Sequence, residues 1–186
     1  IRFSADGKTG YITDSGTRGA IIVVDLDTGD AFRALDGHKS TQVEKDVIVE
    51  IDGRPLRRPD GRQPSFSSDG LAISNDGRTL YWQALTGRTL YSIDTSKLSK
   101  GASASDVEAA VKTVGTTNVA DGLWMGSDGT LYITSPTDNS VKYWTGDALE
   151  PVVVVVLDCV LQARESVPDG VEEGVGILSH AEPPGR

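Results

Sequence analysis

A short phrase repeats three times along this chain, and the repeat constrains the fold more than any other feature. Each copy is an Asp-Gly pair followed by an alternating segment that carries a tyrosine, and the copies begin at Asp6, Asp76 and Asp128, 70 and 52 residues apart. A supersecondary unit that recurs in this way marks a repeat architecture. An interval of 52 residues, built from strands, suits the blades of a β-propeller, which hold about 40–50 residues in four strands.

Alternating and continuous apolar segments place the strands of each unit. A loop rich in Arg, Pro, Gly and Ser is expected over 54–68, and a short helix over 106–112, with Ser105 as its cap and Glu108 reaching back. The expected strands are 10–13, 20–24, 31–35 and 46–51, then 70–74, 79–83 and 89–93, then 122–125, 130–135, 140–144 and 151–157.

The repeat stops before the end of the chain. We therefore predict a partial propeller domain over 1–158 and an irregular or disordered tail over 159–186, where a fourth copy would begin. Ile1 opens directly on a strand-like segment, so we expect this chain to be a fragment of a longer protein. Three blades would leave apolar faces without neighbours, which predicts self-association of the isolated fragment.

Composition excludes two classes of partner. The net charge is −9 and the sequence pI is about 4.6, whereas nucleic acids and anionic membranes require a basic face. The longest aliphatic run, 152–157, is far below the roughly 18 residues of a membrane span. The single cysteine, Cys159, has no CxxC partner. The oligomeric state stays open.

A second Asp-Gly pair lies seven residues before two of the repeated turns, at Asp69 and Asp121. In a propeller the innermost strands surround a central channel, so residues that open these strands can converge from different blades. Two such carboxylates offer hard oxygen ligands for a divalent cation or acceptors for an ammonium group. The alternative is that both pairs only form turns, because Asp-Gly is a common turn dipeptide.

Other residues are weaker candidates for the same site. Trp124 follows Asp121 by three residues and is placed to form a wall of the channel, and Asn118 could approach its mouth or hold a turn. Trp82 and Trp144 suit the core between blades better than a ligand pocket. The arginines at 54, 57, 58 and 62 form a local basic patch, which we expect to be solvated.

Several longer phrases carry a family resemblance. Residues 10–16 (GYITDSG), 22–26 (IVVDL) and 80–91 (LYWQALTGRTLY) make residues 1–150 similar to the major royal jelly/Yellow protein family. This resemblance implies an all-β, six-bladed propeller with about three blades of four-stranded antiparallel sheet present in this chain. It also implies secretion, to an extracellular or periplasmic location, and a relationship in fold to the gluconolactonase/regucalcin-like lactonases.

The lactonase relationship implies a particular metal site. In those enzymes a Glu, two Asn and an Asp hold a divalent cation, such as Ca²⁺, in the channel. Asp69 and Asp121 stand at two of these positions, but Asp69 departs from the Asn of the lactonase pattern. The Glu and the other Asn would lie upstream of Ile1.

Three functions therefore remain open. The first is a secreted propeller that binds a small ligand, such as an aromatic amine, in its channel through Asp69 and Asp121, with Trp124 and Asn118 nearby. The second is a metal-dependent, lactonase-like hydrolase, in which the cation polarises the lactone and activates water. The third is a structural or interaction propeller without catalysis. The resemblance also includes dopachrome-converting proteins, so whether the protein is an enzyme is left undecided.

Overall fold

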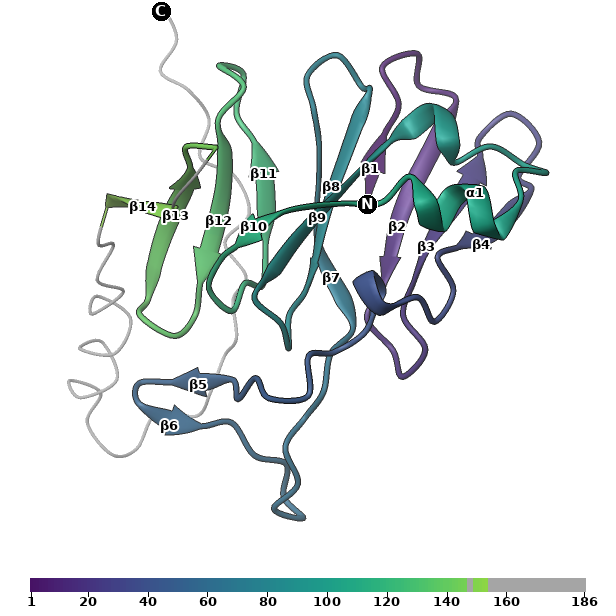
Figure 1. The fold of residues 1–186 in the computed structure, drawn as a ribbon. Coiled ribbons are helices and arrows are strands. Elements are labelled where there is room, and N and C mark those ends of the chain that lie inside the picture. Colours follow the sequence, from purple (N-terminus) through teal and green to yellow (C-terminus); the bar gives the residue numbers. More distant parts are fainter. Residues whose placement is uncertain (147–148, 154–186) are drawn as a thin grey trace, which may run out of the picture. The chain divides into compact units, whose positions relative to one another are not determined.

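The computed structural model describes residues 1–146 and 149–153, which fall within one compact unit. These residues form three four-stranded antiparallel sheets and one two-stranded hairpin (Figure 1). Within each larger sheet every strand pairs with the next strand along the chain, so each sheet is a simple meander. Meanders of this kind are propeller blades. The predicted all-β fold with about three blades is confirmed.

The blades follow one another along the sequence. Their strands are β1 (Arg2–Phe3), β2 (Thr9–Asp14), β3 (Ala20–Asp25) and β4 (Ala31–Ala34) in the first blade, β7 (Ser68–Ile73), β8 (Thr79–Ala84), β9 (Thr89–Asp94) and β10 (Lys112–Thr116) in the second, and β11 (Leu123–Met125), β12 (Leu131–Ser135), β13 (Ser140–Trp144) and β14 (Leu149–Val153) in the third. Helix α1 (Ala104–Ala109) lies between β9 and β10.

The repeated Asp-Gly phrase is the turn between the first two strands of each blade. In the second blade the Asp76 carboxylate accepts hydrogen bonds from the Ser74 hydroxyl (2.6 Å) and the Arg78 amide (3.0 Å). Gly77 has a φ of 72°, a left-handed conformation that glycine adopts without a steric cost. In the turns at Asp6 and Asp128, the carboxylate likewise accepts a hydrogen bond from the amide two residues on. The repeat therefore reports one local geometry used three times.

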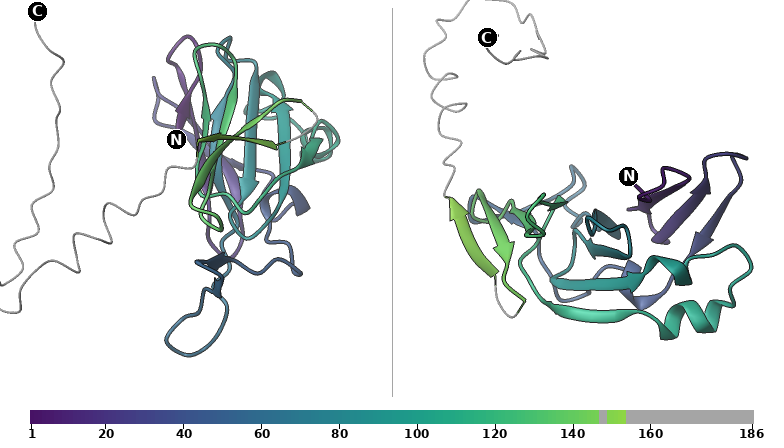
Figure 2. Two further views of the ribbon diagram at one scale, coloured as in Figure 1. Left: turned by 90° about the vertical axis from the view of Figure 1, so that its left-hand side faces the viewer. Right: turned by 90° about the horizontal axis from the view of Figure 1, so that it is seen from above.

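The three sheets lie side by side, with β1, β7 and β11 along their inner side (Figure 2). The first two blades share a buried cluster that includes Tyr11, Ile21 and Trp82. The second and third share another, which includes Leu123 and Ile133. Each sheet thus buries a face against its neighbour, which supplies the main stabilisation of the fold.

Two of the three tryptophans pack between blades. Trp82 is fully buried, and its indole nitrogen donates a 2.9 Å hydrogen bond to the Ser40 carbonyl. Trp144 packs against the cluster between the second and third blades and lies over Gly115. Gly115 adjoins a bulge in β10, and a Cβ there would stand 2.3 Å from the Trp144 ring. The bulge and the glycine together make room for the ring.

The segment between the first and second blades differs from the predicted strand and loop. Only Glu50–Ile51 of the expected strand 46–51 is extended, as β5, and it pairs with β6 (Arg54–Pro55) inside the expected loop. The hairpin forms because Asp52 and Gly53 both have positive φ, 52° and 69°, as a tight two-residue hairpin turn requires. Val47 and Val49 then pack with Val119 in a third buried cluster.

The predicted helix over 106–112 is displaced. Helix α1 ends at Ala109, and its cap is Ser103 rather than Ser105, because the Ser103 hydroxyl accepts the Asp106 amide at 3.1 Å. Lys112 instead begins β10, the outer strand of the second blade, which the sequence did not predict. Both Ser103 and Ser105 are residues that suit a helix N-cap, and the structure uses Ser103.

The end of the third blade lies partly outside the described residues. Strand β14 overlaps the expected strand 151–157 over 151–153, and the rest of that prediction, like the tail 159–186, falls where the structure is not described. Among the described residues, no helix has the length and apolarity needed to cross a membrane.

Gly19 provides a test of how the first blade meets the following segment. A Cβ at Gly19 would stand 2.1 Å from the Thr41 carbonyl oxygen and 2.6 Å from Ser67 Cβ, so backbone would have to move. Gly19→Ala should lower the free energy of unfolding by about 3 kcal/mol, measured by urea denaturation. Gly10→Ala is the control, since its Cβ would meet only side chains at 3.6 Å or more. Equal stability of the two variants would contradict this packing.

Candidate functional site

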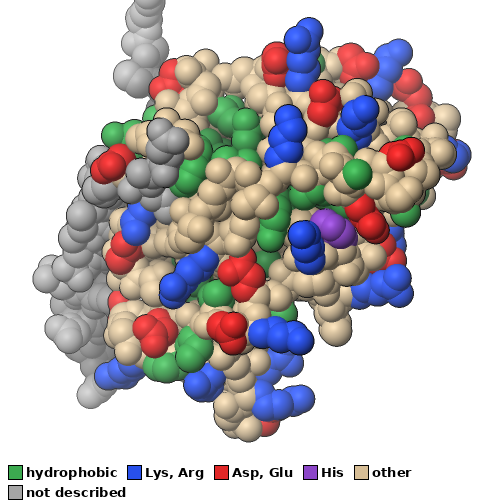
Figure 3. Space-filling view, in the orientation of Figure 1, with side chains coloured by type: hydrophobic (Ala, Val, Ile, Leu, Met, Phe, Trp, Pro, Cys, Tyr) green, Lys and Arg blue, Asp and Glu red, His purple; other side chains and the backbone are tan. Residues whose placement is uncertain are grey.

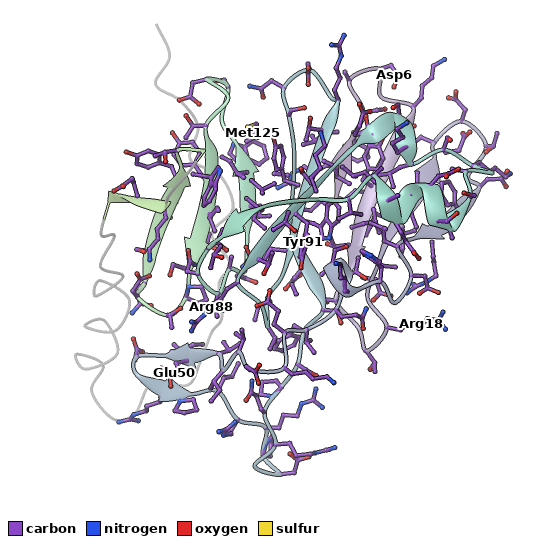
Figure 4. All side chains as sticks on the ribbon, in the orientation of Figure 1. Asp6, Arg18, Glu50, Arg88, Tyr91 and Met125 are labelled. Atoms are coloured by element: carbon purple, nitrogen blue, oxygen red, sulfur yellow. The ribbon has the colours of Figure 1, made fainter. Side chains whose placement is uncertain are left out.

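One end of the blades holds the turns between their second and third strands, which are the β2–β3, β8–β9 and β12–β13 turns. The first strands of the second and third blades, β7 and β11, begin at this same end. We call this the lower end, defined by residues 15–19, 69–70, 85–88, 118–122 and 136–139, while the Asp-Gly turns lie at the opposite end. Arg88 and Met125 mark the two ends in Figure 4. Asp69, Asp121 and Asn118 all belong to the lower end. It therefore gathers most of the predicted site residues.

A bulge positions Asp69. The pairing of β7 with β8 shifts between Ser68 and Gly70, so Asp69 is the extra residue of the strand. The Ser68 hydroxyl donates to the Ala20 carbonyl at 3.0 Å, and the Thr13 hydroxyl donates to the Asp69 carbonyl at 2.7 Å. The first blade thus holds the bulge from one side.

The third blade approaches the bulge from the other side. A Cβ at Gly70 would stand 3.0 Å from Leu123 Cγ and 3.4 Å from the Asp121 carbonyl oxygen, so glycine lets the two inner strands come this close without a shift of Leu123. This approach places Asp69 and Asp121 near enough for the charge of one to influence the other.

The carboxylate pair has unequal members. Asp69 is half-buried and Asp121 is exposed. Burial raises the pKa of Asp69 above its usual value, and the negative charge of Asp121 raises it further. Such a pair is held in place at a cost that a bound cation would relieve.

The described residues do not complete a metal site. No group of three or more His, Cys, Asp or Glu side chains among them could hold a metal ion. Calcium takes 6–8 oxygen ligands, so the two carboxylates would be only part of a calcium site. An ammonium group needs fewer partners, and two carboxylates are sufficient acceptors for it.

Trp124 lies apart from the carboxylate pair. Its side chain is 61% exposed, and the Arg2 guanidinium stands 5.1 Å above its ring while donating to the Leu123 carbonyl at 2.6 Å. It lines a cavity of about 240 Å³ with Phe3 and Asn75, where the inner strands reach the opposite end. Trp124, the expected wall of the channel, is therefore on an inner strand but nearer the opposite end of the blades than Asp69.

Asn118 lines yet another cavity, of about 400 Å³, at the lower end. Its side-chain nitrogen donates to the carbonyls of Val119 and Thr134, whereas its Oδ1 is buried and has no hydrogen-bond partner among the described residues. The structure thus brings Asp69 and Asp121 together and places Trp124 and Asn118 in two separate cavities.

Sequence reasoning missed Arg2 and Arg88, which line these two cavities. Arg88 had a signal: it lies in the second hairpin turn of its unit, and that turn falls at the lower end in every blade. Arg2 had none, because β1 spans only two residues and its contact with the third blade depends on the closure of the inner strands.

A family model described as major royal jelly protein matches residues 4–150. This chain belongs to the major royal jelly protein family. The predicted membership is therefore confirmed, whereas the further likeness to lactonases stays a prediction. No curated protein matches the sequence.

Solved structures with similar folds are distant in sequence. A nidogen/laminin complex shares 15% identity at a TM-score of 0.49, with 81% of this chain and 46% of that chain covered. A luciferin-regenerating enzyme shares 15% identity at a TM-score of 0.45, with 75% of this chain and 38% of that chain covered. The β-propeller domain of Cps50 (Swd1) from Myceliophteria thermophila shares 14% identity at a TM-score of 0.42, with 88% of this chain and 41% of that chain covered. The royal jelly family chain described here spans less than half the length of each.

The raised pKa of Asp69 has a testable effect on stability. At neutral pH its charge is unfavourable in the folded state, and lowering the pH through its raised pKa lets the folded state bind a proton and removes that cost. Asp69→Asn should therefore raise the melting temperature at pH 7 by about 2 °C, and this gain should vanish near pH 3. Asp27→Asn, in an exposed turn, is the charge-matched control. A gain that grows on acidification would contradict the assignment.

Proposed function

We propose that this chain belongs to a secreted propeller that binds a small cationic ligand, such as an aromatic amine, through Asp69 and Asp121. The observation that carries the proposal is the carboxylate pair itself. A bulge in β7 and a close approach at Gly70 place Asp69 near the backbone of Asp121, and the negative charge of Asp121 adds to burial in raising the pKa of Asp69. Secretion is inferred from the family alone.

The chemistry of the pair favours an ammonium group as ligand. An ammonium between two carboxylates makes charge-assisted hydrogen bonds and neutralises the repulsion between them. Because it stabilises the ionised form of Asp69, binding should weaken as the pH falls through the raised pKa of that residue.

A divalent cation is the second candidate for the same pair. The carboxylates offer suitable oxygens, but the described residues supply too few ligands for a complete calcium site. The remaining ligands of the lactonase pattern would lie upstream of Ile1, so the lactonase reaction stays the second candidate. It is kept as an outcome of the experiment below.

Calorimetric titration of the protein with dopamine or serotonin tests the proposal. We expect heat of binding at pH 7, and Asp121→Asn should weaken the affinity about tenfold or more, the usual cost of one charge-assisted hydrogen bond. Asp27→Asn changes the net charge equally and should leave the affinity within about twofold.

Two results would overturn amine binding. One is a flat titration with both amines at millimolar concentration. The other is equal weakening in Asp121→Asn and Asp27→Asn, which would indicate only a general effect of the negative surface. A parallel titration with calcium chloride separates the second candidate: tight calcium binding that depends on Asp121, together with no amine binding, would favour the metal site.

A further inference from the structure

The cavity that contains Asn118 lies between the second and third blades, and the carboxylate pair is not among its lining residues. The β8–β9 turn supplies Arg88, the segment before β11 supplies 117–119, and the end of β12, the β12–β13 turn and β13 supply Ser135, Thr137, Asp138 and Lys142. Its volume of about 400 Å³ falls within the range of small-molecule sites. Nearly all its lining side chains are polar, so it is a wet recess rather than a packing defect.

Arg88 is the charged residue lining this cavity that forms no ion pair among the described residues. Its side chain is exposed, and no salt bridge or side-chain hydrogen bond of its guanidinium occurs among residues 1–146 and 149–153. Its backbone carbonyl, in contrast, accepts hydrogen bonds from both the amide and the hydroxyl of Thr117. The turn is thus fixed while the guanidinium is left available.

The other charges in the cavity neutralise each other. Lys142 Nζ lies 2.7 Å from Asp138, and the Lys142 side chain is only 20% exposed. Burial opposes ionisation of Asp138, but hydrogen bonds from Lys142 and Ser140 lower its pKa to about 2. With this pair closed, the guanidinium gives the cavity a net positive charge although the whole chain carries −9.

Nearby acidic residues are also engaged. Glu44 accepts the Thr89 amide at 2.9 Å, and Asp52 of the β5–β6 hairpin accepts the Asn139 side chain at 2.8 Å. On the face shown in Figure 3, acidic and basic side chains are intermingled over the described residues. Glu44 and Asp52 keep their negative charges, so the positive charge of Arg88 is confined to the cavity that it lines.

Asn118 supplies a hydrogen-bond acceptor, whereas Arg88 supplies a positive charge. Both hydrogens of its amide nitrogen are used on backbone carbonyls, which fixes the orientation of the amide. Its buried Oδ1 then needs a donor, and a buried acceptor without one costs about 1–3 kcal/mol. Because this oxygen is buried, a ligand hydroxyl can reach it only if the lining side chains shift slightly, and the new hydrogen bond would then recover that cost.

We propose that this cavity binds a small hydroxylated carboxylate of sugar-acid size. The guanidinium of Arg88 pairs with the carboxylate, for which its planar fork is suited. Asn118 Oδ1 accepts a ligand hydroxyl, and Thr137 offers a second polar contact. The site requires neither Asp69 nor Asp121, so it stands or falls separately from amine binding.

Titration of the protein with D-glucuronate tests the assignment, with D-glucose and acetate as partial ligands. Glucuronate should bind at least tenfold more tightly than either, because glucose lacks the carboxylate and acetate lacks the hydroxyls. Arg88→Gln should weaken glucuronate binding about tenfold or more and leave the weaker glucose binding unchanged. Arg54→Gln, the same change on the β5–β6 hairpin outside the cavity, should leave glucuronate affinity within twofold.

Amide chemical shifts of the wild-type protein give a readout that does not depend on the variants. Saturation with glucuronate should move the signals of Asn118, Ser135 and Thr137, and not those of the Asp-Gly turns at the opposite end. No binding at 10 mM would overturn the proposal. So would acetate binding as tightly as glucuronate, equal losses in Arg88→Gln and Arg54→Gln, or shifts centred elsewhere.

Discussion

The fold depends on one constraint: a four-stranded blade cannot bury its faces by itself, so it must be flanked by other blades. The clusters between blades satisfy this constraint, with Trp82 closing the first interface and Trp144 the second. The inner strands of neighbouring blades also approach one another closely. That approach is permitted by Gly70, which lets β7 pass next to Leu123 and Asp121. The same packing that stabilises the blades therefore creates the carboxylate pair, and the pair is a by-product of closure that can be used for binding.

The two ends of the blades serve different purposes. At one end each Asp-Gly turn is closed by its own aspartate, which accepts a backbone amide two residues on, so these carboxylates are occupied. At the lower end Asp69, Arg88 and Asn118 Oδ1 are held by neighbouring backbone while their functional atoms are left without strong partners among the described residues. Rigid support with free polar atoms is the arrangement that binding requires.

The sequence predicted what is local and periodic. The Asp-Gly turns, the strand order and the number of blades follow from a repeat with fixed spacing, and the offset of seven residues picked out Asp69 and Asp121 without knowledge of the structure. Prediction failed where two local signals competed or where contacts are distant. Ser103 and Ser105 both suited a helix cap, and β10 has a bulge that only its contact with Trp144 explains. The separation of Trp124 from Asp69 could not be predicted, since it depends on how far each side chain lies along its own strand.

The positions of Arg88 and Asn118 show that the repeat predicts more than the Asp-Gly turns themselves: it also predicts which other segments share one end of the blades. In a meander of four strands, the start of the first strand and the turn between the second and third always share one end. Every residue of those segments is therefore a candidate for one surface, including residues that match nothing in the other units. The repeated phrase occupies the opposite end and closes backbone turns, whereas Arg88 and the hairpin anchored through Asp52 lie in segments that the phrase does not include. Differences between aligned units should therefore be examined before their shared residues when a binding surface is sought in a propeller.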